Sequence, residues 1–338
     1  MTPQEAFAAM LALTDLATPH AVRAAVGLGL PKLVVEGVDT LDALAERSGG
    51  RPRAIRSLVA FLQARGVFTQ PAPGRVGLTA IGRVLAGERA VLNLDPGEAA
   101  SHLAQAWPGL MHAVRTGESG YRAVFGRSLW QATAADPALA AGFDRYMAAW
   151  AEQWIPDVAA ARDWSTAGHV VDVGGGAGRL LCALLAVTPA LTGTLVEMEG
   201  AAERGRAALE AAGLADRGAV TVGSFFDPLP PGHDLYILAQ VLHDWPDAEA
   251  VRILRHCADA ARRAPAGKGR VLLIERLVGD PPSPAHLRSD LFMLTLFGGA
   301  ERSLAEFTAL CDAARLDISA TRPIGHDLSF IECTPRPA

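Results

Sequence analysis

The chain has 338 residues, of which 50% are hydrophobic and 20% charged. This length favours two domains, and this composition excludes a disordered chain. A formal net charge of −5 gives no general reason to expect nucleic acid or an anionic membrane as a partner, and no run of about 18 apolar residues predicts a membrane span.

Two features bear on the cellular compartment. The N-terminal stretch MTPQEAFAAM is acidic and lacks the hydrophobic region of a secretory signal. The cysteines are scattered and form no CxxC pair: Cys182, Cys257, Cys311 and Cys333. We therefore expect reduced thiols in a cytoplasmic protein.

The first 90 residues are expected to form short helices followed by one hairpin. Apolar residues recur at helical spacing from Thr18 to a Gly-Leu-Pro break, and Thr40 is placed to cap a helix that ends at Gly49. A further helix over 51–66 is followed by two short strands around a Pro-Gly turn. This order is the outline of a winged helix, which we assign to residues 1–95.

Residues 96–164 are expected to be a helical connector and substrate lid. This region holds five of the six tryptophans: Trp107, Trp130, Trp150, Trp154 and Trp164.

From residue 165 to 338 strands and helices alternate, which predicts an α/β domain with a parallel sheet covered on both faces. The expected strands are HVVDVG, GTLVEM, AVTVGS, DLYILAQ and RVLLIER, with a final antiparallel hairpin of ISATRPI and LSFIECTP.

The glycine turn in VVDVGGGAGRLL is the first candidate binding element. A dinucleotide fingerprint would need a third glycine where Arg179 stands, whereas the chain has Gly174, Gly176 and Gly178. A purely structural turn is the alternative. Glu197, at the end of the next strand, favours binding because a carboxylate there can accept hydrogen bonds from both hydroxyls of a ribose. Ser224 and Phe225 close the third strand and offer a polar group and an apolar face for adenine.

A site for adenosine that has no phosphate-binding fingerprint points to S-adenosyl-L-methionine (SAM). The motifs of the chain also carry a family resemblance. VVDVGGGAGRL, LVEM, GSFFDPLP, LAQVLHDWPDAEAVRIL, VLLIERLV and DLFMLTLFGGAERSLAEFTALCDAARL are similar in order and spacing to the SAM-dependent O-methyltransferases of small phenols. These are the plant caffeic acid type and bacterial antibiotic-tailoring relatives. The resemblance covers nearly the whole chain, including the winged helix, and implies a Rossmann-like SAM-binding domain and a homodimer.

The resemblance also implies roles for individual residues. It places a general base at His243 with Glu275 and Glu301 beside it, and it implies SAM as methyl donor, S-adenosyl-L-homocysteine as product and no metal. Cofactor contacts are expected from Asp172, Gly174, Gly176, Glu197, Ser224, Phe225 and Gln240. Contacts with an aromatic substrate are expected from Phe143, Met147, Trp150, Phe292, Met293 and Phe297.

Each of these assignments has a plainer alternative. His243 could be a surface histidine at a helix start capped by Asp244, and the two glutamates could be solvated or salt-bridged carboxylates beside Arg276 and Arg302. The apolar residues at i, i+4 and i+7 could be core.

Two positions depart from the family pattern: Ser224 stands where Asp is usual, and Ala239 where Lys is common. Either loss weakens cofactor binding by about one hydrogen bond, roughly 0.5–1.5 kcal/mol for a neutral one. These departures keep open a relative that binds SAM but runs hydroxylation, decarboxylation or ring closure, and also N-methylation.

A winged-helix DNA-binding regulator is the alternative from another class. The support for this alternative is four arginines on the candidate recognition helix, a segment without acidic residues: Arg51, Arg53, Arg56 and Arg65.

Overall fold

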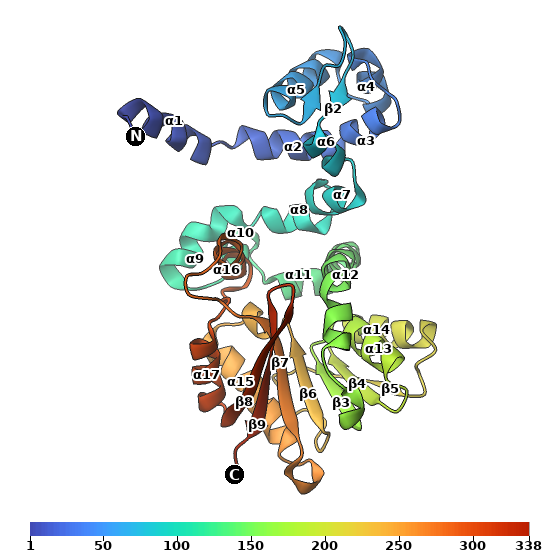
Figure 1. The fold of residues 1–338 in the computed structure, drawn as a ribbon, viewed down its shortest axis with the longest axis vertical. Helices are drawn as coiled ribbons and strands as arrows, with labels where there is room; N and C mark the ends of the chain where they lie inside the picture. Colours follow the sequence, from blue (N-terminus) through green and yellow to red (C-terminus); the bar gives the residue numbers. More distant parts are fainter. Residues whose placement is uncertain (338) are drawn as a thin grey trace. The chain divides into compact units, whose positions relative to one another are not determined.

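A computed structural model describes residues 1–337, which separate into two compact units, the first over Met1–Gln105 and the second from Ala106 onward (Figure 1). Within these residues no helix is long and apolar enough to cross a membrane.

The first unit is mostly helical. The predicted cap is present, because Thr40 Oγ1 accepts a hydrogen bond from the amide of Ala43, and the helix ends at Gly49 with φ of 69°. Leu30, Leu44 and Phe68 are fully buried or nearly so in the core of this unit. Its elements are α1 (Pro3–Leu13), α2 (Ala17–Gly27), α3 (Leu30–Val35), α4 (Leu41–Ser48), α5 (Pro52–Ala64), the antiparallel pair β1 (Phe68–Thr69) and β2 (Gly77–Leu78), α6 (Ala80–Leu85), α7 (Glu88–Leu94) and α8 (Ala99–Ala104).

The second unit contains, within the described residues, a seven-stranded sheet in the order β5-β4-β3-β6-β7-β9-β8. Strands β3 to β7 run parallel, and β9 pairs antiparallel with β7 and β8. The expected α/β class with antiparallel final strands is therefore confirmed. The strands are β3 (His169–Val173), β4 (Thr192–Glu197), β5 (Gly218–Val222), β6 (Leu235–Ala239), β7 (Arg270–Arg276), β8 (Leu316–Gly325) and β9 (Leu328–Pro335).

Both faces of the sheet are covered by helices, as Figure 1 shows. Along β3 the side chains alternate: Val171 and Val173 pack with α15 and α17, whereas Val170 packs with α12 and α13. This two-sided burial explains why the central strands are continuously apolar. The covering helices are α12 (Pro137–Ala160), α13 (Arg179–Val187), α14 (Glu199–Ala211), α15 (Asp247–Ala261) and α17 (Leu304–Ala313).

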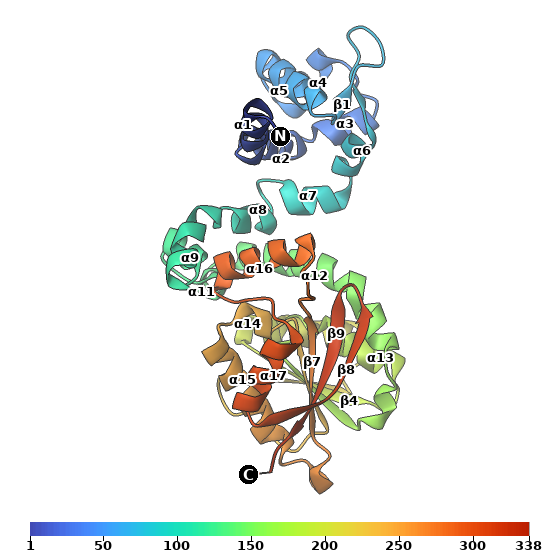
Figure 2. The same cartoon turned by 60° about the vertical axis from the view of Figure 1, so that its left-hand side comes forward.

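Four further α-helices and one 3₁₀ helix of the second unit lie near the carboxyl ends of the parallel strands. Figure 2 shows α16 across that end of the sheet, where it contacts the short 3₁₀ helix η3. Such an edge is where open α/β sheets place their ligands. These elements are α9 (Leu110–Thr116), α10 (Gly120–Phe125), α11 (Leu129–Ala135), η3 (Leu242–Asp244) and α16 (Pro284–Phe297).

Candidate active site

The glycine turn after β3 is joined to the end of β4. Glu197 Oε1 accepts a hydrogen bond of 3.1 Å from the amide of Gly176, and its Oε2 accepts one of 2.7 Å from the amide of Met198. Gly174 and Gly176 have backbone φ angles of 71° and 61°, a region that residues other than glycine rarely adopt. The turn and the carboxylate thus form one unit at the sheet edge.

Asp172, the last but one residue of β3, is a buried carboxylate below this turn. Neither of its oxygens has a hydrogen-bond partner of ordinary geometry among residues 1–337. Burial, followed by the charge of Glu197, raises the pKa of Asp172 to about 7. Buried polar groups are normally paired, so an unpaired carboxylate at this place fits a ligand that brings a donor or a positive charge. SAM brings both.

Ser224 and Phe225 lie where the sequence predicts, directly beyond β5. The Ser224 hydroxyl accepts from the amide of Phe226 at 3.1 Å. The ring of Phe225 lies over the turn, since a methyl group built on Gly174 would come within 3.1 Å of it. Phe225 also packs edge-on against Trp245, with ring centroids 5.7 Å apart. An apolar face therefore borders the glycine turn.

His243 lies in η3 and is only 8% exposed. The alternative of a surface histidine is therefore wrong. The capping role of Asp244 is wrong as well, because α15 begins after Pro246 and has no side-chain cap. Asp244 instead approaches the imidazole, with its Oδ1 3.5 Å from Nε2.

Glu275 and Glu301 face the other imidazole nitrogen. Nδ1 of His243 lies 3.9 Å from Glu275 Oε2 and 3.5 Å from Glu301 Oε1, and it makes no hydrogen bond of ordinary length within residues 1–337. The two glutamates are 0% and 6% exposed, so they are not solvated carboxylates. The alternative of a salt bridge holds for Glu301, whose Oε1 lies 3.7 Å from Arg276 Nη1.

Glu275 bonds chiefly to the segment that carries the histidine. Its Oε1 accepts from the amides of Val241 and Leu242 at 3.1 and 2.8 Å, and its Oε2 accepts from Nε2 of Gln240 at 3.1 Å. Gln240 adopts φ of 54° at the end of β6. The strand end of β7 thereby holds the loop that positions His243.

Glu301 is held from α16. Its Oε1 accepts from the Ser289 hydroxyl at 2.6 Å, and its amide donates to Asp290 Oδ1 at 3.0 Å. Gly299 allows this segment to pass the histidine closely, because a Cβ there would lie 2.1 Å from the carbonyl oxygen of His243.

The surrounding carboxylates change the basicity of the imidazole. Burial works to lower the pKa of His243, but Asp244, Glu275 and Glu301 outweigh it and raise that pKa to about 9. Burial likewise works to raise the pKa of Glu301, but its contacts with His243, Ser289 and Arg276 lower it to about 2. Burial raises the pKa of Asp244 to about 7 against the charge of His243. The three carboxylates therefore strongly stabilise the protonated form of His243.

The predicted substrate residues are not all equally exposed. Phe143 and Phe297 meet Trp130 of α11: Trp130 stacks on Phe297 with centroids 5.2 Å apart and meets Phe143 edge-on at 6.0 Å. Phe292 lies 6.0 Å from Trp107. Met147 is 42% exposed, Trp150 is half-buried and packs edge-on with Tyr146, and Met293 is buried.

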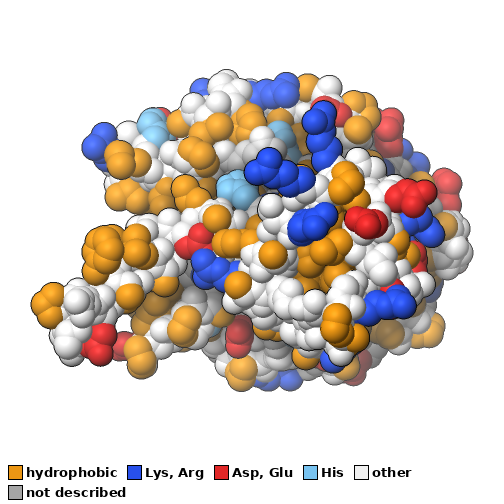
Figure 3. Space-filling view, turned by 90° about the horizontal axis from the view of Figure 1, so that it is seen from above, with side chains coloured by type: hydrophobic (Ala, Val, Ile, Leu, Met, Phe, Trp, Pro, Cys, Tyr) orange, Lys and Arg blue, Asp and Glu red, His pale blue; other side chains and the backbone are white. Residues whose placement is uncertain are grey.

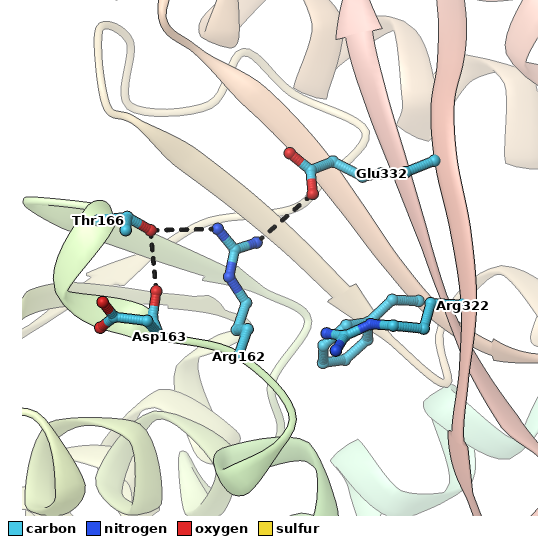
Figure 4. Close-up of a pocket in the computed structure, with 7 residues that line it drawn as sticks. Arg162, Asp163, Thr166, Arg322 and Glu332 are labelled. Atoms are coloured by element: carbon cyan, nitrogen blue, oxygen red, sulfur yellow. Dashed lines mark hydrogen bonds and ion pairs between the residues drawn. The ribbon is translucent and has the colours of Figure 1, made fainter.

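A cavity of about 370 Å³ lies elsewhere, between the end of α12 and the β8–β9 hairpin. Figure 4 shows that its charges are partly paired: Arg162 reaches Glu332 at 3.8 Å and Thr166 at 3.5 Å, and the Arg322 guanidinium lies over Phe330. It contains none of the predicted site residues.

Four residues of the site were not predicted from the sequence. Asp244 was interpreted only as a cap, and Trp130 only as one of a group of tryptophans. Ser289 and Asp290 lie in the middle of a helix and carry no local signal that they meet Glu301.

A buried histidine and carboxylates beside a glycine turn, at the carboxyl edge of a parallel sheet, define a group-transfer enzyme that binds a nucleoside-containing cofactor. The family model of the O-methyltransferase domain matches residues 107–316. The chain belongs to the O-methyltransferase family, whose methyl donor is SAM, so the resemblance inferred from its motifs is confirmed.

Individual relatives cover almost the whole chain. It is 40% identical to the 2,7-dihydroxy-5-methyl-1-naphthoate 7-O-methyltransferase of Streptomyces carzinostaticus over 99% of both proteins. It is 39% identical to the aclacinomycin 10-hydroxylase RdmB of Streptomyces purpurascens, over 95% of this chain and 88% of that protein.

A solved structure of another O-methyltransferase has the same fold as this chain. The O-methyltransferase from neocarzinostatin biosynthesis, crystallised with S-adenosylmethionine and 2-hydroxy-5-methyl naphthoic acid, superimposes with a TM-score of 0.88 at 40% identity. The match covers 96% of this chain and 98% of that one.

Proposed function

We propose that this enzyme methylates a phenolic hydroxyl on an aromatic secondary metabolite of the hydroxynaphthoate kind, with His243 as general base. The observation that carries the proposal is the buried imidazole among Asp244, Glu275 and Glu301, on the same sheet edge as the glycine turn. A phenol with a pKa near 10 is a poor nucleophile at neutral pH, so a base at the acceptor accelerates its attack.

The two imidazole nitrogens have different surroundings. Nδ1 faces Glu275 and Glu301, which favour a proton there and leave Nε2 as the nitrogen that accepts the proton of the acceptor hydroxyl. Asp244 beside Nε2 then stabilises the imidazolium.

The cofactor contacts are proposed for the residues around the turn. SAM, when bound, supplies an electrophilic methyl group for in-line displacement by the acceptor oxygen. Glu197 would accept hydrogen bonds from the ribose hydroxyls, Asp172 would pair with a donor on the amino-acid part, and Phe225 would cover the adenine. Gly174 and Gly176 leave room for the backbone to approach, with Ser224 and Gln240 at the border.

Glu197→Ala should weaken binding of S-adenosyl-L-homocysteine at least tenfold in calorimetry. The physical reason is that a hydrogen bond to a charged carboxylate contributes roughly 1.5–3 kcal/mol. Glu199→Ala is the matched control, because Glu199 is an exposed glutamate two residues further on. Equal affinity of Glu197→Ala and the wild type would contradict the role of Glu197, and equally strong binding of NAD would contradict the choice of cofactor.

The acceptor is proposed to bind against the predicted aromatic set, with Trp130 added. A flat ring suits a surface made by Phe143, Trp130 and Phe297, in which Trp130 contacts both phenylalanines. Incubation with SAM and a panel of hydroxynaphthoates and smaller phenols, followed by mass spectrometry, tests this. A gain of one methyl group on a naphthoate supports the proposal, and turnover of none of the panel contradicts it.

Hydroxylation is the second candidate, favoured by the 39% identity to a 10-hydroxylase. The same mass spectra separate the two, because hydroxylation adds one oxygen and consumes no methyl group. We favour methylation because the chain keeps a histidine with flanking carboxylates at the expected place.

We further propose a division of labour: a winged-helix dimerisation domain over 1–95, a connector and lid over 96–164, and the catalytic domain over 165–338. Helices α4 and α5 followed by the β1–β2 hairpin support the winged-helix assignment. The cytoplasmic location expected from the cysteines stays a prediction.

The enzyme should be a homodimer formed through its first 95 residues. Not one residue of α1 is buried in the single chain, and Phe7, Leu11 and Leu13 are 59%, 53% and 88% exposed. Figure 3 shows hydrophobic side chains exposed along this helix. Obligate dimer interfaces commonly bury about 2,000 Å² or more of such surface. Light scattering at micromolar concentration should give twice the chain mass; a monomer would refute the proposal.

DNA binding is not favoured. Arg65 pairs with Asp15 at 3.2 Å and lies over Phe61, so one of the four arginines is already engaged. A salt-dependent gel shift on random duplex would reveal it if present.

A further inference from the structure

Three donors converge on one oxygen of Glu301. The Ser289 hydroxyl lies 2.6 Å from Oε1, His243 Nδ1 lies 3.5 Å from it, and Arg276 Nη1 lies 3.7 Å from it. The serine contact has the length of a strong, charge-assisted hydrogen bond, and the histidine contact is longer than an ordinary one.

Ser289 belongs to α16, the helix that also carries the proposed acceptor contacts Phe292 and Phe297. Its neighbour Asp290 accepts the amide of Glu301 at 3.0 Å. Helix α16 therefore holds Glu301 by both its side chain and its backbone, and Glu301 is not free to move toward the histidine.

A hydroxyl that donates to a carboxylate oxygen occupies one of its lone pairs and draws off part of its negative charge. Both effects weaken the hydrogen bond that this oxygen can accept from a neighbouring imidazolium. In agreement, Nδ1 of His243 is buried without an ordinary hydrogen bond in the described part of the chain.

We propose that Ser289 is a positioning residue that competes with His243 for Glu301 Oε1 and so enlarges the fraction of the imidazole that is neutral and able to accept a proton. The proposal rests on the proposed function for its catalytic consequence. The other charged groups around the histidine stay in place. Asp244 on η3 and Glu275 on β7 face the imidazole, whereas Arg276 pairs with Glu301 and Asp290 accepts its amide. The buried Arg302 donates to the carbonyl of Leu242, next to the histidine.

The direct test is NMR titration of the full-length enzyme with ring-labelled histidine, the His243 signal being assigned by its loss in His243→Ala. In Ser289→Ala the carboxylate should pair more tightly with the imidazole, and the His243 pKa should rise by on the order of one unit. Ser289→Thr keeps the hydroxyl and should restore the wild-type value. An unchanged pKa in Ser289→Ala, or the same rise in Ser289→Thr, would overturn the proposal.

Kinetics separate this proposal from the role of His243 as base. If both hold, Ser289→Ala should lose about tenfold in kcat at neutral pH and recover wild-type rate well above the His243 pKa. A loss of equal size at every pH would show a merely structural role and overturn the proposal. A shifted NMR pKa with an unmoved pH–rate profile would support the competition for Glu301 and contradict the base.

Discussion

Replacing His243 with alanine is expected to lower kcat by about 10²–10⁴-fold on an ordinary phenol, with little change in affinity for S-adenosyl-L-homocysteine. The reason is that the buried imidazole takes the acceptor proton, while the cofactor contacts lie on the glycine turn and Glu197. Stopped assays with a saturating acceptor measure kcat, and calorimetry measures the affinity. His326→Ala, in the exposed turn between β8 and β9, is the control and should keep its rate.

The pH profile of the wild type carries the same argument. Because the carboxylates raise the pKa of His243 to about 9, the imidazole is mostly protonated at neutral pH and cannot accept a proton. The rate should therefore rise with pH toward about 9. An acceptor that is already ionised at neutral pH should be nearly indifferent to His243→Ala. Equal losses on acidic and ordinary phenols would instead mean that His243 only positions the acceptor.

Glu275→Ala should be the most damaging change to the carboxylates. It removes the acceptor of the Val241 and Leu242 amides and of Gln240, all next to the histidine. A buried donor left unpaired costs about 1–3 kcal/mol, so we expect a loss of unfolding free energy of at least 2 kcal/mol, with kcat falling about 10²-fold or more. Urea titration and steady-state assays measure the two.

Glu275→Gln is the matched control, because an amide oxygen can still accept both backbone amides. It should keep most of the stability. Removing one negative charge near the imidazole lowers the pKa of His243, so the rising limb of the pH–rate profile should move to lower pH. A limb that stays at its wild-type position would show that Glu275 acts only on the loop and not on the basicity of His243.

The local patterns of this chain could be interpreted without a structure. The central strands HVVDVG, GTLVEM, DLYILAQ and RVLLIER were predicted correctly because strands buried on both faces are continuous apolar runs bounded by turn residues. The cap at Thr40 and the helix end at Gly49 follow rules that act over three or four residues. The motifs around His243 also placed the candidate base, since short stretches with fixed spacing carry the family resemblance.

Helix α1 and the aromatic contact of Trp130 with Phe297 were not predicted. Trp130 and Phe297 are 167 positions apart, and only the folded chain brings the ring from α11 against the ring from α16. No periodicity in either segment encodes that meeting.

The sequence by itself determined which segments form the strands and where the glycine turn lies. It also determined that His243 follows β6, that Glu275 lies at the end of β7 and that Glu301 follows α16. Only the tertiary structure decided what those glutamates do. Because β7 lies beside β6, Glu275 reaches the backbone of the histidine loop before it reaches the imidazole. Because α16 crosses the same edge, Ser289 takes the oxygen of Glu301 that faces His243. Hydrogen bonds act over about 3 Å, and only the folded sheet brings residues tens of positions apart within that distance.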